Sequence, residues 1–105
     1  MHRLEVTYSA ECVTLVFRGR LTLYEIRHAQ SGLLAVAPLV EKRNCYIDLR
    51  HIERFDMAAV QLLLAWERQV RSNAQSLLLQ TSDTTAALLR SLGLSRLVAQ
   101  SPEAL

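Results

Sequence analysis

The sequence predicts an α/β domain whose sheet is mixed but mainly parallel, with four to five strands flanked by three to four helices. Segments of β-type alternate with segments of helical periodicity, in the order β-β-α-β-α-β-α with or without a final strand. The loops between them are short, which favours parallel strands joined by right-handed crossovers. Half of the 105 residues are hydrophobic, so the chain can bury a core of its own.

The overall composition limits the classes of protein to consider. One domain is expected over residues 1–100, with residues 101–105 as a disordered tail. A formal charge of +2, with acids and bases interspersed, does not predict nucleic-acid binding. The N-terminus lacks the apolar region of a signal peptide, and the longest apolar run is too short to cross a bilayer. We therefore expect a soluble, cytoplasmic protein.

Two strands open the chain, residues 4–9 and 12–19, and they could form a hairpin. In each, apolar side chains alternate and share one face. These are Leu4, Val6 and Tyr8 in the first strand, predicted to be an edge strand, and Val13, Leu15 and Phe17 in the second. Gly19 is expected to end the second strand.

The first helix is predicted from Leu23 towards Pro38, because Thr22 and Glu25 have the spacing of a capping box. Gly32 inside it lowers helix propensity by about 1 kcal/mol relative to alanine. The expected apolar stripe is Ile26, Ala29, Leu33, Leu34 and Ala37.

The middle of the chain is predicted to form a strand over residues 45–50 and a helix over residues 58–70. The strand has Cys45, Ile47 and Leu49 on one side. The helix has an inward stripe of Ala59, Leu62, Leu63, Trp66 and Val70, and an outward face with Gln61, Glu67, Arg68 and Arg71. Both cysteines, Cys12 and Cys45, fall in strands; one disulfide is arithmetically allowed, but reduced thiols are expected.

The last third begins with residues 76–81, which are short and uniformly apolar and predict a buried strand. A helix follows, with Ser82 or Asp83 as its N-cap and a Schellman-type stop at Gly93 and Leu94. Residues 96–100 could add a final short strand.

The sequence contains no recognisable catalytic, cofactor or metal motif. His2, His28 and His51 do not have metal-ligand spacing with each other or with a cysteine, and the three glycines form no phosphate-binding loop. Asp48 lies within a strand and Asp56 at a helix start, so a shared acid–base role is not expected. We predict a non-enzymatic protein without a metal or a cofactor.

Asp56 lies between the third predicted strand and the helix that follows it. An aspartate at this position is expected to be the N-cap, with its carboxylate accepting from the backbone N–H of Ala58 or Ala59. Met57, Ala58 and Ala59 carry no reactive group. Two interpretations stay open: a well-capped core helix, or a smooth helix end that a partner can approach closely.

Residues 45–66, CYIDLRHIERFDMAAVQLLLAW, resemble the signature of STAS domains, the family of sulphate transporters and anti-sigma factor antagonists. In that signature a strand ending in an Asp-Leu pair leads through a short loop to an Asp, small or hydroxyl residues and an apolar helix. Residues 17–25 and 88–98 are similar to the family's second strand and closing helix. The resemblance implies the same α/β fold over most of the chain.

Carried over residue by residue, Asp56 matches the family's Asp, and Ala58 falls where phosphorylatable members carry Ser or Thr. Met57 replaces a residue that is commonly small or hydroxylated, and Ala59 stands where Gly is usual. A phosphate adds about −1.5 to −2 charge and can repel a partner. The resemblance therefore implies a member with no phosphorylation at Ala58.

The function that the resemblance implies is protein binding, as an anti-sigma factor antagonist (anti-anti-sigma) type regulator. Its partner would be an anti-sigma factor, a kinase-like protein or another signalling protein, in a bacterial chemosensory or two-component pathway. The expected surface comprises Thr22, Tyr24, Asp56, Met57, Ala58, Ala59, Gln61, Ser82 and Asp83.

The alternative function is a cytoplasmic STAS accessory subunit of a phospholipid-trafficking ABC transporter, whose partner would be the ATPase. Nucleotide binding, suggested for some family members, is weak here because no Gly-rich loop or basic cluster is present. The first strand, as an open edge, could also pair with a second copy in a homodimer.

Overall fold

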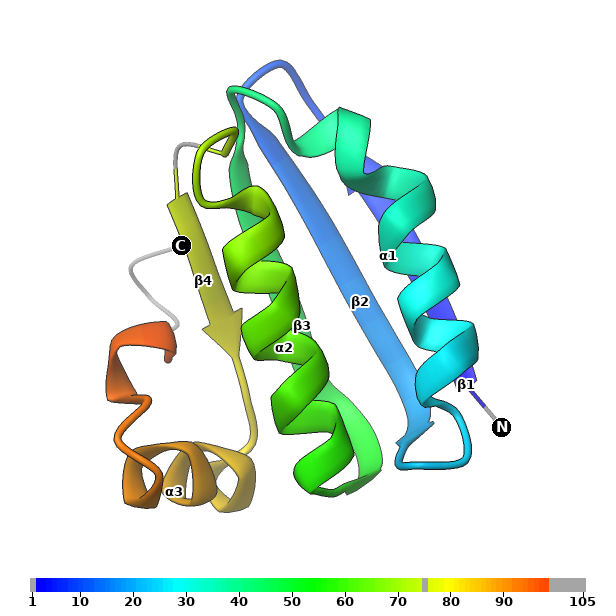
Figure 1. Cartoon of the computed structure of the whole chain (residues 1–105), viewed down its shortest axis with the longest axis vertical. Coiled ribbons are helices and arrows are strands. Elements are labelled where there is room, and N and C mark those ends of the chain that lie inside the picture. Colours follow the sequence, from blue (N-terminus) through cyan, green and yellow to red (C-terminus); the bar gives the residue numbers. More distant parts are fainter. Residues whose placement is uncertain (1, 75, 99–105) are drawn as a thin grey trace.

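The computed structural model describes residues 2–74 and 76–98, which form an α/β fold with all four strands in one sheet (Figure 1). In chain order the elements are β1 (His2–Tyr8), β2 (Cys12–Leu21), α1 (Ile26–Val40), β3 (Asn44–Phe55), α2 (Met57–Val70), β4 (Ser76–Gln80), α3 (Asp83–Ser91) and the short 3-10 helix η1 (Ser95–Leu97). The strand order is β1-β2-β3-β4. β1 is antiparallel to β2, and the other two pairs are parallel, which confirms the mixed, mainly parallel sheet.

The core lies between the sheet and helices α1 and α2, which run side by side over it (Figure 1). The inward residues predicted for β2, β3 and α2 are all buried. In β1, Leu4 and Val6 pack against this core, whereas Tyr8 is 63% exposed, contrary to expectation. Tyr8 is the last residue of an edge strand, where its ring lies 5.7 Å from the Arg43 guanidinium instead.

The two central strands are longer than predicted. β2 does not end at Gly19; this glycine has φ 91° beside an irregularity in the pairing with β3, and the strand continues to Leu21, which is fully buried. β3 likewise continues through residues 51–55, where a loop was expected. The two extensions pair with each other, Gly19 with Ile52 and Leu21 with Phe55. Backbone pairing thus extends both strands beyond the residues whose apolar alternation predicted them.

Helix α1 begins and ends later than predicted. Residues 22–25 form a turn before it, and Glu25 is its N-cap without a side-chain cap bond. Pro38 does not stop the helix, which runs on to the fully buried Val40. Leu34, expected on the apolar stripe, is 54% exposed. The buried residues of α1 are Ala29, Leu33 and Val40.

Gly32 has a packing role in α1. A Cβ atom placed on it would lie 3.1 Å from Cδ2 of Leu4, a tight contact with the edge strand β1. Glycine therefore fits the close approach of α1 to β1 at this position.

The C-terminal region is partly as expected. β4 is the other edge of the sheet, not a buried strand: only Leu79 is buried in it. Of the predicted final strand, residues 96 and 97 lie in η1, and Val98 makes a single parallel bridge with Leu79. Residues 99 and 100 of the predicted strand, and the predicted tail 101–105, lie outside the described residues.

Helix α3 confirms both of its predicted ends. Ser82 is the N-cap, with its side chain accepting from Thr85 N. At the other end Gly93 has φ 77° and donates to Arg90 O, while Leu94 N donates to Leu89 O at 2.9 Å, the Schellman pattern.

Two further properties of the chain concern its cysteines and its helices. Both cysteines are unpaired thiols, and burial raises the pKa of Cys45 to about 11, so this thiol stays neutral. No helix in the described part of the chain has the length and apolar character needed to cross a membrane.

Candidate functional site

The candidate site lies where the parallel strands β2, β3 and β4 end, at the lower edge of Figure 1. The turn of residues 22–25 follows β2, α2 begins directly after β3, and α3 begins after β4. Loops at the carboxyl ends of parallel strands form the usual functional edge of such sheets. The topology therefore gathers most of the predicted site residues at one end of the molecule.

The Asp56 carboxylate joins two of these segments. Its Oδ1 accepts from Ala58 N at 3.0 Å and from Ala59 N at 3.3 Å, which confirms the predicted N-cap of α2. Its Oδ2 accepts from Leu23 N at 3.0 Å, a residue 33 positions away in the sequence. Asp56 thus fixes the turn after β2 against the start of α2, and all three of these bonds use backbone donors.

The turn of residues 22–25 is held by Glu25. Its Oε1 accepts from Thr22 N at 3.0 Å and from Thr22 Oγ1 at 2.5 Å. Thr22 Oγ1 accepts from Tyr24 N rather than from Glu25 N, so only half of the predicted capping box forms. The hydrogen bond from Thr22 lowers the pKa of Glu25.

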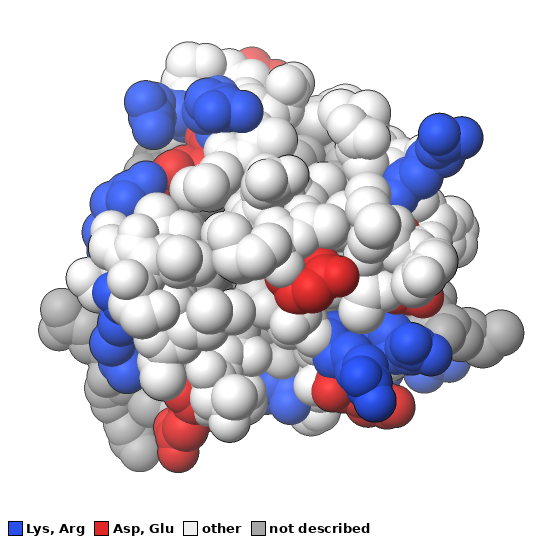
Figure 2. Space-filling view, turned by 60° about the horizontal axis from the view of Figure 1, so that its bottom comes forward, with Lys and Arg blue, Asp and Glu red and all other residues white. Residues whose placement is uncertain are grey.

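Three large side chains are exposed at this end: Leu23 at 68%, Tyr24 at 88% and Met57 at 50%. We call them the Leu23–Tyr24–Met57 surface. Figure 2 brings this end forward and shows a broad uncharged area with an acidic group within it and basic groups toward its margins. Large exposed apolar side chains on two adjoining segments are typical of surfaces that bind another molecule.

The predicted site residues differ in their accessibility. Tyr24, Met57, Gln61, Ser82 and Asp83 are exposed, and Asp56 and Ala58 are half-buried. Thr22 and Ala59 are buried, so their side chains position the surface and do not belong to it, which corrects the expectation.

Leu23 is a member of the surface that the sequence did not predict. An apolar residue next to a capping-box threonine was expected to start the helix. It is exposed because α1 begins only at Ile26, and no signal in the sequence marks that delay.

The start of α3 lies at the same end but apart from Asp56. Ser82 Oγ donates to Thr85 Oγ1 and accepts from Thr85 N, so it is engaged within its own helix. A hollow of about 580 Å³ lies between the last residues of β3, including Arg54 and Phe55, and the start of α3. The structure therefore brings Ser82 and Asp83 to the same end of the sheet as Asp56, without a described hydrogen bond to it.

Asp48, the other carboxylate considered for chemistry, is a structural group. Its side chain is buried and accepts from Arg50 N at 2.9 Å, Arg50 Nε at 3.0 Å and Arg50 NH2 at 2.9 Å. Burial acts to raise the pKa of Asp48, but the hydrogen bonds and the charge of Arg50 outweigh it and lower the pKa. Asp48 and Asp56 are held by different donors, the first by Arg50 and the second by backbone N–H groups.

Comparison with known proteins identifies relatives of this fold. The family model described as "Mlab, STAS domain" matches residues 4–99. Comparison with curated proteins finds no significant match.

Several solved structures are similar. An anti-sigma factor antagonist from Mycobacterium paratuberculosis has 12% identity and a TM-score of 0.82, covering 99% of this chain and 90% of that one. A STAS domain protein from Planctomyces limnophilus has 19% identity and a TM-score of 0.76, covering 96% and 92%. The Bacillus cell fate determinant SpoIIAA in its phosphorylated form has 17% identity and a TM-score of 0.69, covering 99% and 95%.

At these identities the solved structures establish the fold, and they match the element order and the mainly parallel sheet described above. The family model spans all but the first few described residues. The chain belongs to the STAS domain family.

Proposed function

We propose that this protein is a non-enzymatic regulator of the anti-sigma factor antagonist type, which binds a cytoplasmic protein partner through the Leu23–Tyr24–Met57 surface. The observation that carries this proposal is that these exposed side chains stand on the two segments that Asp56 joins, at the carboxyl ends of the parallel strands. The similar fold of proteins described as anti-sigma factor antagonists supports it. The partner is an anti-sigma factor, a kinase-like protein or a related signalling protein.

Binding at this surface is proposed to be independent of phosphate at residue 58. Ala58 has no hydroxyl, and its half-buried side chain sits in the first turn of α2 with its N–H donated to Asp56. The neighbouring Met57 adds apolar contact area instead. Apolar and aromatic side chains at the centre of an interface commonly supply most of its binding energy.

The proposal is tested by affinity capture from an extract of cells that produce the protein, with the bound proteins identified by mass spectrometry. Tyr24→Ala removes the most exposed side chain of the surface. Tyr8→Ala is the matched control, because Tyr8 is also an exposed tyrosine but lies before β2, at the opposite end of the sheet. We expect Tyr24→Ala to capture at least about tenfold less of a signalling partner than the wild type does, and Tyr8→Ala to capture an unchanged amount.

Ala58→Glu adds a negative charge where a phosphorylated member would carry one. We expect it to lose the same partner while keeping its circular dichroism spectrum, because the charge would face a surface shaped for an apolar loop. Equal capture by wild type, Tyr24→Ala and Ala58→Glu would mean that this end of the molecule is not the binding surface.

The second candidate function is an accessory subunit of a phospholipid-trafficking ABC transporter. The alanine at position 58 is compatible with it, since a permanently bound subunit needs no phosphate switch. Recovery of an ABC ATPase that depends on Tyr24, in place of an anti-sigma factor or kinase, would favour this function.

A further inference from the structure

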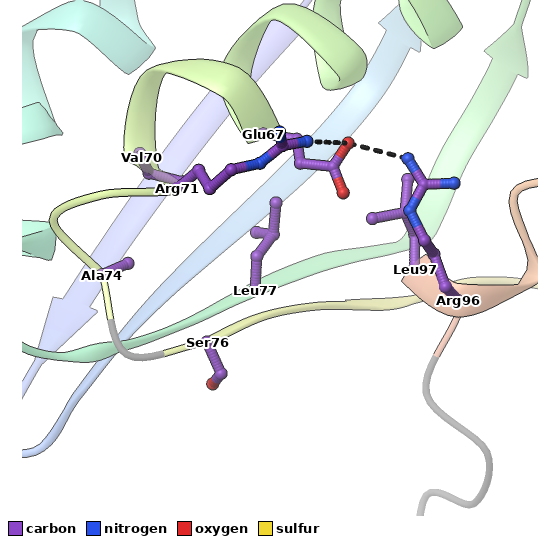
Figure 3. A pocket seen from close by; sticks show the side chains of 8 residues that line it. All are labelled: Glu67, Val70, Arg71, Ala74, Ser76, Leu77, Arg96 and Leu97. Carbon is purple, nitrogen blue, oxygen red and sulfur yellow. Dashed lines mark hydrogen bonds and ion pairs between the residues drawn. The ribbon is translucent and has the colours of Figure 1, made fainter.

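A pocket of about 270 Å³ lies away from the candidate site, between the last turn of α2, the start of β4 and η1 (Figure 3). Pockets for drug-sized ligands usually span roughly 300–1,000 Å³, so this one suits a smaller molecule. Its position on the edge strand β4 places it at the margin of the core.

The inner wall of the pocket is apolar. It is formed by Val70, Ala74, Leu77 and Leu97. Figure 3 shows Leu77 pointing toward the side of the pocket where Glu67 lies, whereas the Ser76 side chain points away. Val70 and Leu97 are buried in the core cluster, and Ala74 and Leu77 are half-buried against it. Such a wall favours an aliphatic group.

The rim of the pocket carries two guanidinium groups and one carboxylate. Arg96 NH2 lies 2.9 Å from Glu67 Oε1, and Arg71 NH2 lies 3.9 Å from the same oxygen (Figure 3). The Glu67 side chain is only 16% exposed, whereas that of Arg71 is 70% exposed. Arg96 is therefore the close partner of Glu67, and Arg71 is the loosely held one. Among the residues that line the pocket, two guanidinium groups therefore share a single carboxylate.

We propose that this pocket binds a small amphiphile with a single anionic group and a short aliphatic tail. The tail lies against the apolar wall, and the anionic group pairs with Arg71. Glu67 competes with that group for the arginine, since both are anions at the same rim. This proposal does not depend on the function of the Leu23–Tyr24–Met57 surface.

The proposal is tested by titrating the full chain, labelled with 15N, with octanoate and, separately, with octan-1-ol as the uncharged analogue. We expect saturable shifts of the amides of Ala74, Leu77 and Leu97 with octanoate. An exposed ion pair is worth a factor of about two to five, so octan-1-ol should bind more weakly by about that factor. The absence of saturable shifts, or equal affinity for both compounds, would overturn the proposal.

Two charge variants are expected to change the affinity for octanoate in opposite directions. Arg71→Gln should weaken octanoate binding by about two- to fivefold, and Glu67→Gln should strengthen it by a similar factor because a competing anion is removed. Arg68→Gln is the matched control: Arg68 is an exposed arginine of the same helix that does not line the pocket. Weaker binding by Glu67→Gln, or an equal loss by Arg68→Gln, would contradict the assignment.

Ala74→Met fills the pocket without changing its charge, and should abolish the saturable shifts while the remaining amide spectrum is kept. The natural ligand could be a free amphiphile or a lipid with an anionic headgroup. Flotation with phosphatidylglycerol vesicles that is lost in Ala74→Met would identify the lipid; octanoate binding without flotation would identify the free compound. Saturable binding that persists unchanged in Ala74→Met would place the ligand elsewhere and overturn the proposal.

Discussion

The starts of α1 and α2 lie at the same edge of the sheet, yet an acidic side chain acts differently in each. Glu25 accepts from Thr22, three residues away, and closes a local turn. Asp56 caps its own helix and also accepts from Leu23, 33 residues away. The local contact closes the turn that precedes α1, and the long-range contact holds that turn against the start of α2. Together they leave Leu23 and Tyr24 exposed beside Met57.

This difference indicates that Asp56, more than Glu25, holds the Leu23–Tyr24–Met57 surface together. Asp56 is half-buried and serves three backbone donors on two segments. Glu25 serves one residue. The loss of Asp56 should therefore disturb both segments, whereas changes at the other helix starts should remain local.

The largest effect is expected for Asp56→Ala. It leaves the N–H groups of Leu23, Ala58 and Ala59 without their acceptor, and the free energy of unfolding should fall by about 2 to 3 kcal/mol. Urea denaturation followed by circular dichroism measures this change. Asp56→Asn keeps one carbonyl oxygen for the α2 cap, so it should lose less. Equal losses in both variants would show that charge matters more than the number of acceptors.

Ser82→Ala tests the third helix start, where the cap is entirely local. The α3 cap bond to Thr85 N is removed, and the expected loss is about 1 kcal/mol in the free energy of unfolding. Partner capture should be unchanged if the binding surface is centred on Tyr24. A loss of capture as large as that of Tyr24→Ala would extend the surface to α3.

Ala58→Ser adds a hydroxyl at the position where the resemblance to STAS domains places the Ser or Thr of phosphorylatable members. Serine has a lower helix propensity than alanine, so a loss of about 0.5 kcal/mol or less is expected from chemical denaturation. Capture of the proposed partner should persist, because the added group is small and uncharged. Its loss would show that the surface tolerates no added atom there.

Glu25→Gln should have the smallest effect at neutral pH, because the amide oxygen can still accept from Thr22. The two proteins are expected to differ in the pH dependence of their stability. The pKa of Glu25 is lowered by the Thr22 hydrogen bond, so its contribution to stability is present above the ordinary carboxyl pKa and is lost as pH falls below about 4 through the lowered value. We expect the acid-induced decrease in thermal midpoint to be shallower in Glu25→Gln. An equal decrease of the thermal midpoint with pH in the wild type and in Glu25→Gln would contradict the coupling between the pKa of Glu25 and stability.

Much of this fold could be predicted because its strands and helices have clear periodicity. Val13, Leu15 and Phe17 alternate, and Leu62, Leu63 and Trp66 recur at helical spacing, and all six are buried as expected. The extension of β3 over residues 51–55 could not be predicted. Those residues gain their strand conformation by pairing with the end of β2, and their side chains carry no β-type pattern.

The candidate site could be predicted in part. Asp56 was identified as a cap because its chemistry is local, and Tyr24 and Met57 were identified through the resemblance to STAS domains. The bond from Leu23 to Asp56 could not be identified, since it depends on two loops meeting at the sheet edge. The burial of Thr22 and Ala59 likewise depends on the way in which the helices pack.

The amino-acid sequence alone determined the element order, most of the inward faces, the caps of α2 and α3 and the absence of a hydroxyl at position 58. These depend on side-chain periodicity and on contacts within a few residues. Tertiary structure decided how far β2 and β3 extend, where α1 begins, and which apolar side chains remain outside the core. The reason is physical: backbone pairing and packing join residues that are distant in the chain, and their energies can override local preference.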